Sequence, residues 1–402
     1  MADLDELDKI ISSLEEKSQV TGAVQDYNGK AMMSATSKSS EEILELSKKQ
    51  ASEFKAYPLS HRIGLLEKSI RVLEERESEI PKLYCRESGK PISFCKQEFE
   101  TGIEIGKHLL KILESTTSYQ RGNETEVLVH KPLHHLIFRA GSYTDLIKVV
   151  FSSIGSGSPA MILPSRGVVA TAYDVKGLLS GIVGSNIAIE ISDDSIEQVI
   201  DLTRRRHIFM LSADCDFESA ASVISERVAL THKPVFVFVD GSVAEPFMSS
   251  LHENLKALKS GDPMDMETGL CKYDEEAIGE FLRQKNSVKK KPKFGLDIVG
   301  KNITPGLYLA GEFDRHIPNN IKMGPVVAAF ESSNMVHGAH FANLLNAESA
   351  SIFAKDMEGI FEVTKYLDCP FIFTNSRPKE VRLAESILDI MQKKRRLFLQ
   401  TI

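Results

Sequence analysis

Five cysteines could supply a nucleophilic thiol, but none stands in a spacing that marks a reaction centre. They are single and scattered, with no Cys-x-x-Cys pair: Cys85, Cys95, Cys215, Cys271 and Cys369. Cys215 stands at the start of an expected helix, whose N-terminus could lower its pKa, and Cys271 lies in an expected loop. A structural or merely exposed role is the simpler interpretation of both. The odd number and the scatter favour a reducing compartment without a disulfide framework.

Histidines form two small groups that could ligate a metal. His130, His134 and His135 occur within six residues, and His337 and His340 share a possible helix. Structural and catalytic zinc sites combine histidine with cysteine or carboxylate ligands at defined spacing, which neither group has. The sequence therefore predicts no metal site, and exposed faces explain both groups.

Two further patterns could bind anions. Gly155-Ser156-Gly157 is a turn that could face a phosphate, although it has neither the third glycine nor the ribose-binding acid of a dinucleotide fingerprint. The basic run Lys289–Lys293 is most simply a solvated loop. Arg204-Arg205-Arg206 is most simply a cationic cluster at a helix C-terminus.

The elements that position these residues alternate between strand and helix. Short apolar strands are expected at 136–138, 160–163, 187–191, 207–211 and 235–239, with helices between them, including one at 195–204. Such alternation predicts βαβ units and parallel sheets. The stretch Ala213–Phe247 reads as a capped helix, a Pro-terminated link and a buried strand, and we expect two domains to meet there.

Composition limits the function classes. The chain has 402 residues, long enough for two or more domains. A formal net charge of −7 and a pI near 5.9 argue against general binding to nucleic acid or anionic membranes. No apolar run approaches the roughly 20 residues that span a bilayer, and the N-terminus lacks a signal-type apolar core. We expect a cytoplasmic, globular protein.

Five short motifs, in order, resemble those of the aldehyde dehydrogenase superfamily. They are Arg62–Glu98 with its Glu-Ser-Gly-Lys-Pro link, Gly155–Ser165, Asp214–Phe247, Lys259–Pro263, and Met323–Val327 followed by Asn343, Ser349–Asp356 and Asn375. The resemblance implies an α/β, aldehyde dehydrogenase-like fold of two parallel-sheet domains with short oligomerisation strands. It also implies that Pro164 and Ser165 are at cofactor-binding positions.

The residues that carry the family's chemistry are replaced. That chemistry needs a cysteine thiolate, an oxyanion donor, a glutamate base and a nicotinamide cofactor. The link 229–234, ALTHKP, has no cysteine, Gly141 stands for the oxyanion asparagine, and Leu163 stands for the cofactor-binding lysine. Ile321 replaces a ribose-binding glutamate, and the short segment between Ser165 and Asp214 lacks both the pyrophosphate turn and the base motif.

These losses predict a catalytically degenerate, shortened member, a pseudoenzyme with a binding or assembly role. No catalytic residue and no cofactor is expected, with NAD(P) the cofactor if the protein is active. The alternative is an NAD(P)-dependent aldehyde oxidoreductase with a rearranged site, in which Thr231, His232 or Cys271 reacts. A polar helix-to-strand turn is the simpler interpretation of Thr231 and His232.

The same resemblance gives the domain and partner predictions. Residues 1–119 and 133–227 are expected to form a degenerate Rossmann-like cofactor-type domain, and 228–392 a catalytic-type domain. Residues 120–132 and 393–402 are expected to be oligomerisation strands. An exposed apolar edge strand is a liability unless it is paired, which favours a homodimer or larger homo-oligomer. A mixed oligomer with an active relative is a further alternative.

Overall fold

The computed structural model describes residues 22–53, 57–115, 118–121, 124–133, 136–192, 196–230, 233–311 and 313–400. They form two compact units. Unit 1 is Met1–Ser88, Cys95–Thr203 and Glu380–Ile402, and unit 2 is Gly89–Phe94 and Arg204–Lys379. No helix among the described residues has the length and apolarity needed to cross a membrane.

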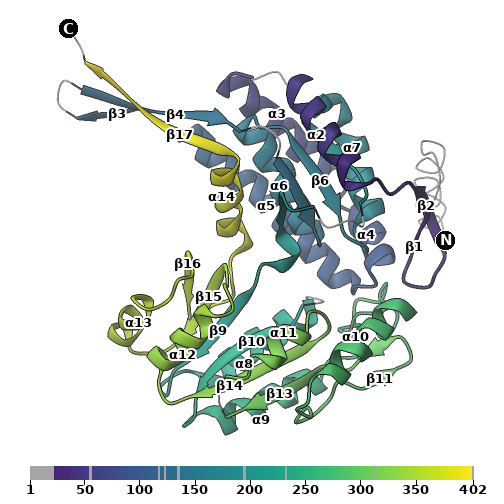
Figure 1. The fold of residues 1–402 in the computed structure, drawn as a ribbon, viewed down its shortest axis with the longest axis vertical. Helices are drawn as coiled ribbons and strands as arrows, with labels where there is room; N and C mark the ends of the chain where they lie inside the picture. Colours follow the sequence, from purple (N-terminus) through teal and green to yellow (C-terminus); the bar gives the residue numbers. More distant parts are fainter. Residues whose placement is uncertain are drawn as a thin grey trace. The chain divides into compact units, whose positions relative to one another are not determined.

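Unit 1 is built on a four-stranded parallel sheet in the order β7-β6-β5-β8. Its strands are β5 (Leu136–Ala140), β6 (Ala160–Pro164), β7 (Ile187–Ile189) and β8 (Val199–Asp201). Its helices are α2 (Ser40–Glu53), α3 (Leu59–Glu74), α4 (Ile80–Ser88), α5 (Ile92–Glu114, whose first turn belongs to unit 2), α6 (Tyr143–Ser156), α7 (Val169–Val183) and α14 (Glu380–Ile390). A hairpin of β1 (Gly22–Gln25) and β2 (Ala31–Ala35) precedes them (Figure 1).

The core of unit 1 centres on β6 and α6. Every residue of β6 is buried, as its apolar sequence AMILP requires of a strand covered on both faces. Every residue of α6 is also buried, although the helix contains Asp145 and Lys148. Because buried charges are unfavourable unless they are paired, these two residues need partners inside the unit.

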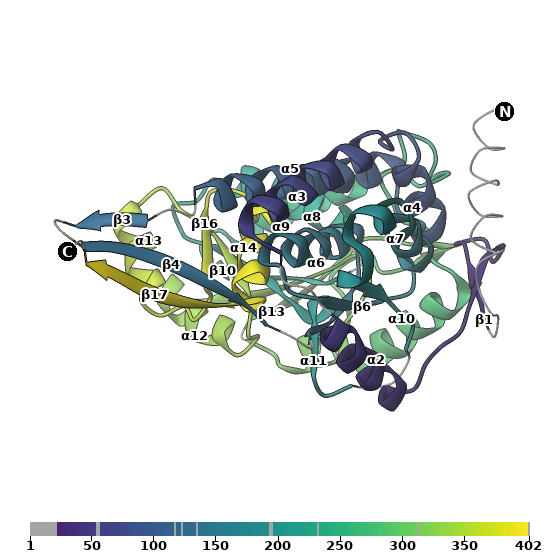
Figure 2. The same ribbon diagram turned by 90° about the horizontal axis from the view of Figure 1, so that it is seen from above.

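A three-stranded antiparallel arm projects from unit 1 (Figures 1 and 2). It has the order β17-β4-β3, with β3 (Ser118–Arg121), β4 (Glu124–Pro132) and β17 (Gln392–Gln400). β4 and β17 pair along their whole length, from Gln392 opposite Pro132 to Gln400 opposite Glu124. Where they are described, the strands predicted at 120–132 and 393–402 are therefore paired with each other within one chain, over 124–132 and 392–400. Residues 122, 123, 401 and 402 lie outside the described part.

Unit 2 is built on a six-stranded, all-parallel sheet in the order β13-β14-β10-β9-β15-β16. Its strands are β9 (His207–Leu211), β10 (Val235–Asp240), β13 (Gly306–Ala310), β14 (Val326–Ser332), β15 (Ser349–Phe353) and β16 (Phe371–Thr374), with a small ribbon of β11 (Ile298–Val299) and β12 (Asn302–Ile303). Its helices are α8 (Phe217–Leu230), α9 (Ala244–Lys256), α10 (Glu275–Ser287), α11 (His316–Asn320), α12 (Met335–Asn343) and α13 (Met357–Thr364).

Apolar cores cover both faces of this sheet. Val235, Val237 and Val239 of β10 belong to the core that includes residues of α8 and α9. Phe236 and Phe238 point to the opposite core, which includes residues of α10, α11, α12 and α13. The alternation follows from the two-residue period of a strand. The α/β architecture with two parallel sheets and additional short strands confirms the predicted fold class.

Two sequence predictions are corrected by the strand pairing. The crossing between units lies at Thr203–Arg204 and not at 227–228, because β9 already pairs with β10 and β15. Ala213–Phe247 therefore lies wholly inside unit 2, and α8 connects two neighbouring strands of one sheet. The helix expected at 195–204 is also wrong, because Val199–Asp201 forms β8 beside β5, followed by a 3-10 turn at Leu202–Arg204.

A carboxyl group on α7 is held in an unfavourable environment in unit 1. Burial raises the pKa of Asp174 to about 6, with Arg76 opposing the shift and Glu79 adding to it. Arg76 is itself ion-paired with Glu79. Burial also raises the pKa of Tyr143, and the negative charge of Asp174 raises it further. Since the folded-state pKa of Asp174 is raised, its contribution to stability is full below about pH 4 and is lost as the pH rises through about 6.

Asp174→Asn should therefore stabilise the protein at neutral pH. We expect the free energy of unfolding to rise by roughly 1–3 kcal/mol at pH 7.5 and to change little at pH 4. Urea unfolding at both pH values measures the difference. Glu100→Gln, on an exposed face of α5, is the control and should show no such pH dependence. Equal effects of Asp174→Asn at the two pH values would contradict the account.

Candidate functional site

The carboxyl ends of β5 and β8 are where a ligand of unit 1 would be expected. The chain leaves β5 through α6 and continues to β6 and β7 on one side, whereas β8 pairs with the other side of β5. The strand order reverses at β5, which makes the gap beyond these strand ends a topological switch point. Ligands of open α/β sheets bind at such points.

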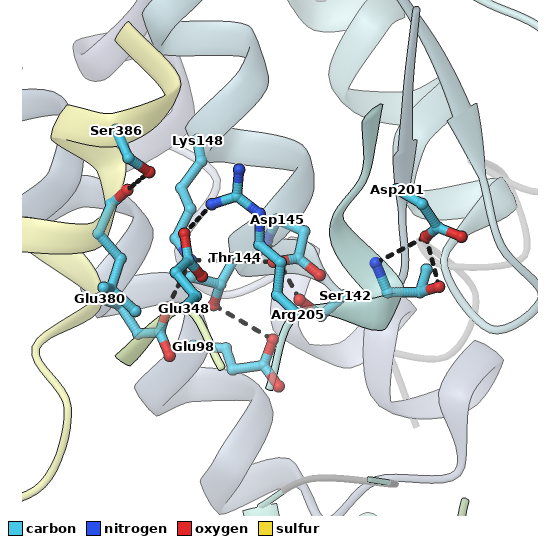
Figure 3. Close-up of polar contacts among 12 residues, drawn as sticks. Glu98, Ser142, Thr144, Asp145, Lys148, Asp201, Arg205, Glu348, Glu380 and Ser386 are labelled. Atoms are coloured by element: carbon cyan, nitrogen blue, oxygen red, sulfur yellow. Dashed lines mark hydrogen bonds and ion pairs between the residues drawn. The ribbon is translucent and has the colours of Figure 1, made fainter. Parts of the chain in front are cut away.

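A threonine side chain is packed against the backbone at this point. Gly141 follows β5, and a Cβ added to it would lie 2.9 Å from Cγ2 of Thr203, which follows β8. Asp201 holds Thr203 there, because its Oδ1 accepts hydrogen bonds from the Thr203 backbone N–H at 2.9 Å and from its hydroxyl at 2.5 Å (Figure 3). The methyl group of Thr203 therefore fills the space next to Gly141.

The N-terminus of α6 is already occupied by protein groups. Ser142 caps it, with its Oγ accepting the Asp145 backbone N–H at 3.1 Å. The Asp145 carboxylate lies in the first turn, where the helix dipole favours a negative charge (Figure 3). A helix N-terminus attracts phosphate through its free N–H groups and its dipole. Here the Ser142 cap already accepts from one of these N–H groups, and the negative charge of the Asp145 carboxylate repels an added anion.

An ion pair between a buried lysine and a partly exposed glutamate balances the charge on α6. Lys148 is 4% exposed, and its Nζ lies 2.5 Å from Oε2 of Glu380 and 3.8 Å from Oδ1 of Asp145 (Figure 3). Glu380 is the first residue of α14, so this pair joins the C-terminal segment to the central helix. Removing one partner of a buried pair leaves an uncompensated charge and is strongly unfavourable. The pair therefore fixes α14, and the strand β17 that follows it, onto unit 1.

The predicted cofactor-binding residues lie at the same edge of the sheet. Pro164 ends β6, and the Ser165 backbone N–H donates to the Ala140 carbonyl at 2.8 Å, next to the end of β5. Leu163, at the position of the family's lysine, is fully buried in an apolar cluster with Ile137 and other residues. It supplies no hydrogen-bond donor toward a ligand. Cofactor binding by Pro164 and Ser165 stays a prediction.

The glutamate of the Glu-Ser-Gly-Lys-Pro link has a structural partner. Glu87 is buried at the start of α7 and accepts hydrogen bonds from the backbone N–H groups of Ala170 and Thr171 and from the Thr171 hydroxyl. Burial raises the pKa of Glu87, and these donors oppose the shift. Glu87 therefore caps α7, which begins shortly after Ser165.

The possible phosphate turn is closed. Gly155 and Ser156 are in the last turn of α6, and Gly157 is its left-handed C-cap with φ of 70°. The Arg62 side chain covers this turn, and its Nη1 donates to the Gly155 carbonyl at 2.5 Å. A helix C-terminus carries partial negative charge and repels phosphate. Gly155–Gly157 is thus a helix C-terminus whose charge and covering side chain disfavour the phosphate contact that the sequence left open.

In unit 2, the thiol that the sequence placed at a helix start is not activated. Burial raises the pKa of Cys215 to about 11, and the charges of Asp214 and Asp216 add to the shift. The acids that cap this segment thus outweigh any effect of the helix N-terminus. Thr231 and His232 lie outside the described residues.

Cys271 lies beside the C-terminal end of α8, where the link 229–234 begins. It is buried, and its Sγ lies 3.6 Å from the carbonyl oxygen of Ala229, at the C-terminal end of α8. The neighbouring residue Tyr273 is also buried, which raises the pKa of its hydroxyl well above the usual value. Sequence reasoning placed Cys271 in a loop but gave no signal that this loop meets the end of α8.

Other candidates have ordinary contacts. His337 contacts the Ser333 hydroxyl, and His340 packs edge-on against Tyr366. His134 and His135 lie outside the described residues. Among those that are described, no three His, Cys, Asp or Glu side chains are grouped to hold a metal. Ile321, at the family's glutamate position, is buried in the core of unit 2.

Comparisons with a family model and with solved structures both find aldehyde dehydrogenases as similar proteins. The model of the aldehyde dehydrogenase family matches residues 12–134. No match was found among curated protein sequences. An NAD-dependent benzaldehyde dehydrogenase from Corynebacterium glutamicum is similar in structure, with a TM-score of 0.77, 16% identity and 95% coverage of both chains.

Two further structures show the same similarity. The NADP-dependent glyceraldehyde-3-phosphate dehydrogenase of Bacillus halodurans has a TM-score of 0.72 and 16% identity, covering 95% of this chain and 96% of its own. An NAD-dependent aldehyde dehydrogenase from Sinorhizobium meliloti has a TM-score of 0.74 and 13% identity, with 95% and 91% covered. The chain therefore has the fold of these aldehyde dehydrogenase structures, and the family model matches residues 12–134.

Proposed function

We propose that this protein does not oxidise aldehydes with NAD(P) and that it uses the superfamily scaffold for binding or assembly. The observation that carries the proposal is the packing of Thr203 against Gly141 at the switch point of unit 1. A dinucleotide needs space and donors beyond the strand ends, and here a methyl group, a capped helix and the carboxylates of Asp145 and Asp201 are found instead.

The chemistry of the replaced residues supports the same proposal. Residues 229–234 contain no cysteine, so the covalent route of the family has no nucleophile at its usual place. Losing one oxyanion donor alone typically costs about 10²–10³ in rate. Leu163 and Ile321 are core residues, so neither position supplies a polar group to a cofactor ribose. The replaced residues all belong to the family's catalytic and cofactor-binding machinery. A change in chemistry or a loss of activity accounts for this pattern better than unrelated substitutions do.

The direct test is calorimetric titration of the protein with NAD+ and NADP+. At about 5 mM cofactor, a site with a Kd of about 1 mM would be largely occupied, and we expect no saturable heat. Thr203→Ala, which removes the methyl group at Gly141, is the matched variant. Saturable binding by the wild type that Ser165→Tyr abolishes would place a cofactor at the predicted position and contradict the proposal.

One observation favours an oxidoreductase with a rearranged site as a second candidate. The contact between the Cys271 Sγ and the Ala229 carbonyl brings a thiol to the end of α8, next to the link where the family carries its nucleophile. In this alternative the Cys271 thiol would add across the aldehyde C=O bond, its proton going to the oxygen, to give a thiohemiacetal. NAD(P)+, if bound, would supply the acceptor for the hydride from the C–H bond, and water would then hydrolyse the thioester to the carboxylic acid and free Cys271.

Aldehyde-dependent formation of NAD(P)H separates the two candidates. With a panel of aliphatic and aromatic aldehydes we expect no turnover above background from the wild type, from Cys271→Ser or from Cys215→Ser. Turnover that is lost in Cys271→Ser and retained in Cys215→Ser would establish the alternative. Cys215 is the appropriate control because it is buried, as Cys271 is, and burial raises the pKa of the Cys215 thiol.

We also propose that the arm formed by β3, β4 and β17 assembles the protein into a homodimer or larger homo-oligomer. β3 and β17 are outer strands of the arm, and β16 is an outer strand of the sheet of unit 2. Phe371, Ile372 and Phe373 of β16 are only partly buried. Outer strands with exposed apolar residues are prone to pair with a strand of another chain. A mixed oligomer with an active relative would use the same strands and would appear as co-purification of dehydrogenase activity.

Size-exclusion chromatography with light scattering measures the assembly. We expect a mass at least twice the 44.7 kDa of one chain at micromolar concentration. Replacing Leu397 and Leu399 of β17 with lysine should yield monomer, whereas Leu282→Lys on the exposed face of α10 should leave the mass unchanged. A monomeric wild type at these concentrations refutes the assembly proposal.

A further inference from the structure

The outer face of α13 exposes a row of apolar side chains. Phe361 is 63% exposed, the largest value for a large apolar side chain in the described part of the chain. Met357, one turn earlier, is 50% exposed, whereas Ile360 and Val363 are buried in the core of unit 2. Residues four apart are neighbours on a helix surface, so Met357 and Phe361 form one row. Packing within unit 2 does not account for this row.

Two further exposed side chains extend the row toward the end of α12, which lies beside α13 (Figure 1). The Asn343 side chain, in the last turn of α12, donates to the Tyr366 carbonyl at 2.7 Å and so places the exposed Leu344 near Tyr366. The Tyr366 hydroxyl donates to Glu362, the neighbour of Phe361, at 3.2 Å. Exposed apolar patches of this kind mark interaction sites. The α13 surface is defined by Leu344, Met357, Phe361 and Tyr366.

The charges on α13 make this surface complementary to itself. Lys365, the C-cap, continues the row of Met357 and Phe361 by one turn, and Glu358 stands beside Met357 at the other end. When two copies of α13 meet antiparallel with Phe361 at the centre, Lys365 of each copy lies opposite Glu358 of the other. Glu362 of the same helix occupies one of the three donors of the Lys365 ammonium, which leaves donors for a second carboxylate. The antiparallel arrangement also opposes the two helix dipoles favourably.

We propose that the α13 surface binds the α13 surface of a second copy of this chain across a two-fold axis close to Phe361. A two-fold contact uses the same patch on both partners, so the patch must be complementary to itself. The α13 surface meets this condition, because its apolar row lies at the centre and its opposite charges lie at the two ends. A partner with a different charge pattern would leave Glu358 and Lys365 without this mutual pairing.

The size of the contact determines its place in the assembly. Four partly exposed side chains supply less than the roughly 800 Å² per partner that a standard stable interface buries. The α13 contact alone therefore does not hold two chains together. It joins two dimers that the arm has already built, where it occurs twice in one tetramer and gains from a high effective concentration. The inference rests on the proposed assembly by the arm and adds a second interface to it.

Light scattering of the full-length protein after size-exclusion chromatography tests the contact. We expect the wild type at micromolar concentration to have a mass about four times the 44.7 kDa of one chain. Met357→Ser/Phe361→Ser removes the apolar row from an exposed face and should raise the dimer–tetramer dissociation constant at least about tenfold, which gives dimers. Met266→Ser/Val299→Ser changes two exposed apolar side chains elsewhere in unit 2 and should leave the tetramer intact.

Charge reversal separates pairing between copies from an effect on helix stability. Lys365→Glu should give dimers, because it places two glutamates opposite each other, and Glu358→Lys/Lys365→Glu should restore the tetramer. Both substitutions oppose the helix dipole, so the double variant would be the worst of the three if only the stability of α13 mattered.

Three results overturn the inference. They are a wild-type dimer, a tetramer that Met357→Ser/Phe361→Ser leaves intact, and a double charge reversal that does not restore the tetramer lost in Lys365→Glu. A monomeric wild type overturns it together with the assembly by the arm, whereas a wild-type dimer overturns this inference alone.

Discussion

The proposed loss of cofactor binding depends on the contact between Thr203 and Gly141. The contact forms because Asp201, the last residue of β8, accepts two hydrogen bonds from Thr203 and so fixes its position. It also requires glycine after β5, since a Cβ at Gly141 would meet the Thr203 methyl at 2.9 Å. The two sides of the switch point are therefore packed against each other. In the proposed account, this packing takes up space beyond the strand ends that a dinucleotide would need.

The rest of unit 1 is consistent with a scaffold that has kept its architecture. Lys148 and Glu380 join α6 to α14, and Glu87 caps α7 with three hydrogen bonds. Each is a buried polar group whose partners lie far away in sequence, so each constrains the fold strongly. The positions that would serve a cofactor are instead part of the core, as at Leu163.

Sequence reasoning was most successful where the pattern is local. The strands β6, β9 and β10 are where the sequence placed them, because burial on both faces makes each a continuous apolar run. The helices α5 and α8 are also where the sequence placed them, because burial of one face gives a helix its apolar period. β8 was missed because a three-residue strand, VID, is too short to show a period. The domain crossing was misplaced because the partners of β9 lie far along the chain. The contact of Thr203 with Gly141 depends on tertiary structure, and no local pattern reveals it.

The central claim is that the switch point of unit 1 is closed to a dinucleotide. Hydrogen–deuterium exchange of the full-length protein, with and without about 5 mM NADP+, examines that place directly. The account predicts unchanged exchange in peptides that cover residues 139–145, 163–170 and 199–206. Protection of these peptides by the cofactor, absent from peptides elsewhere in unit 1, would contradict it.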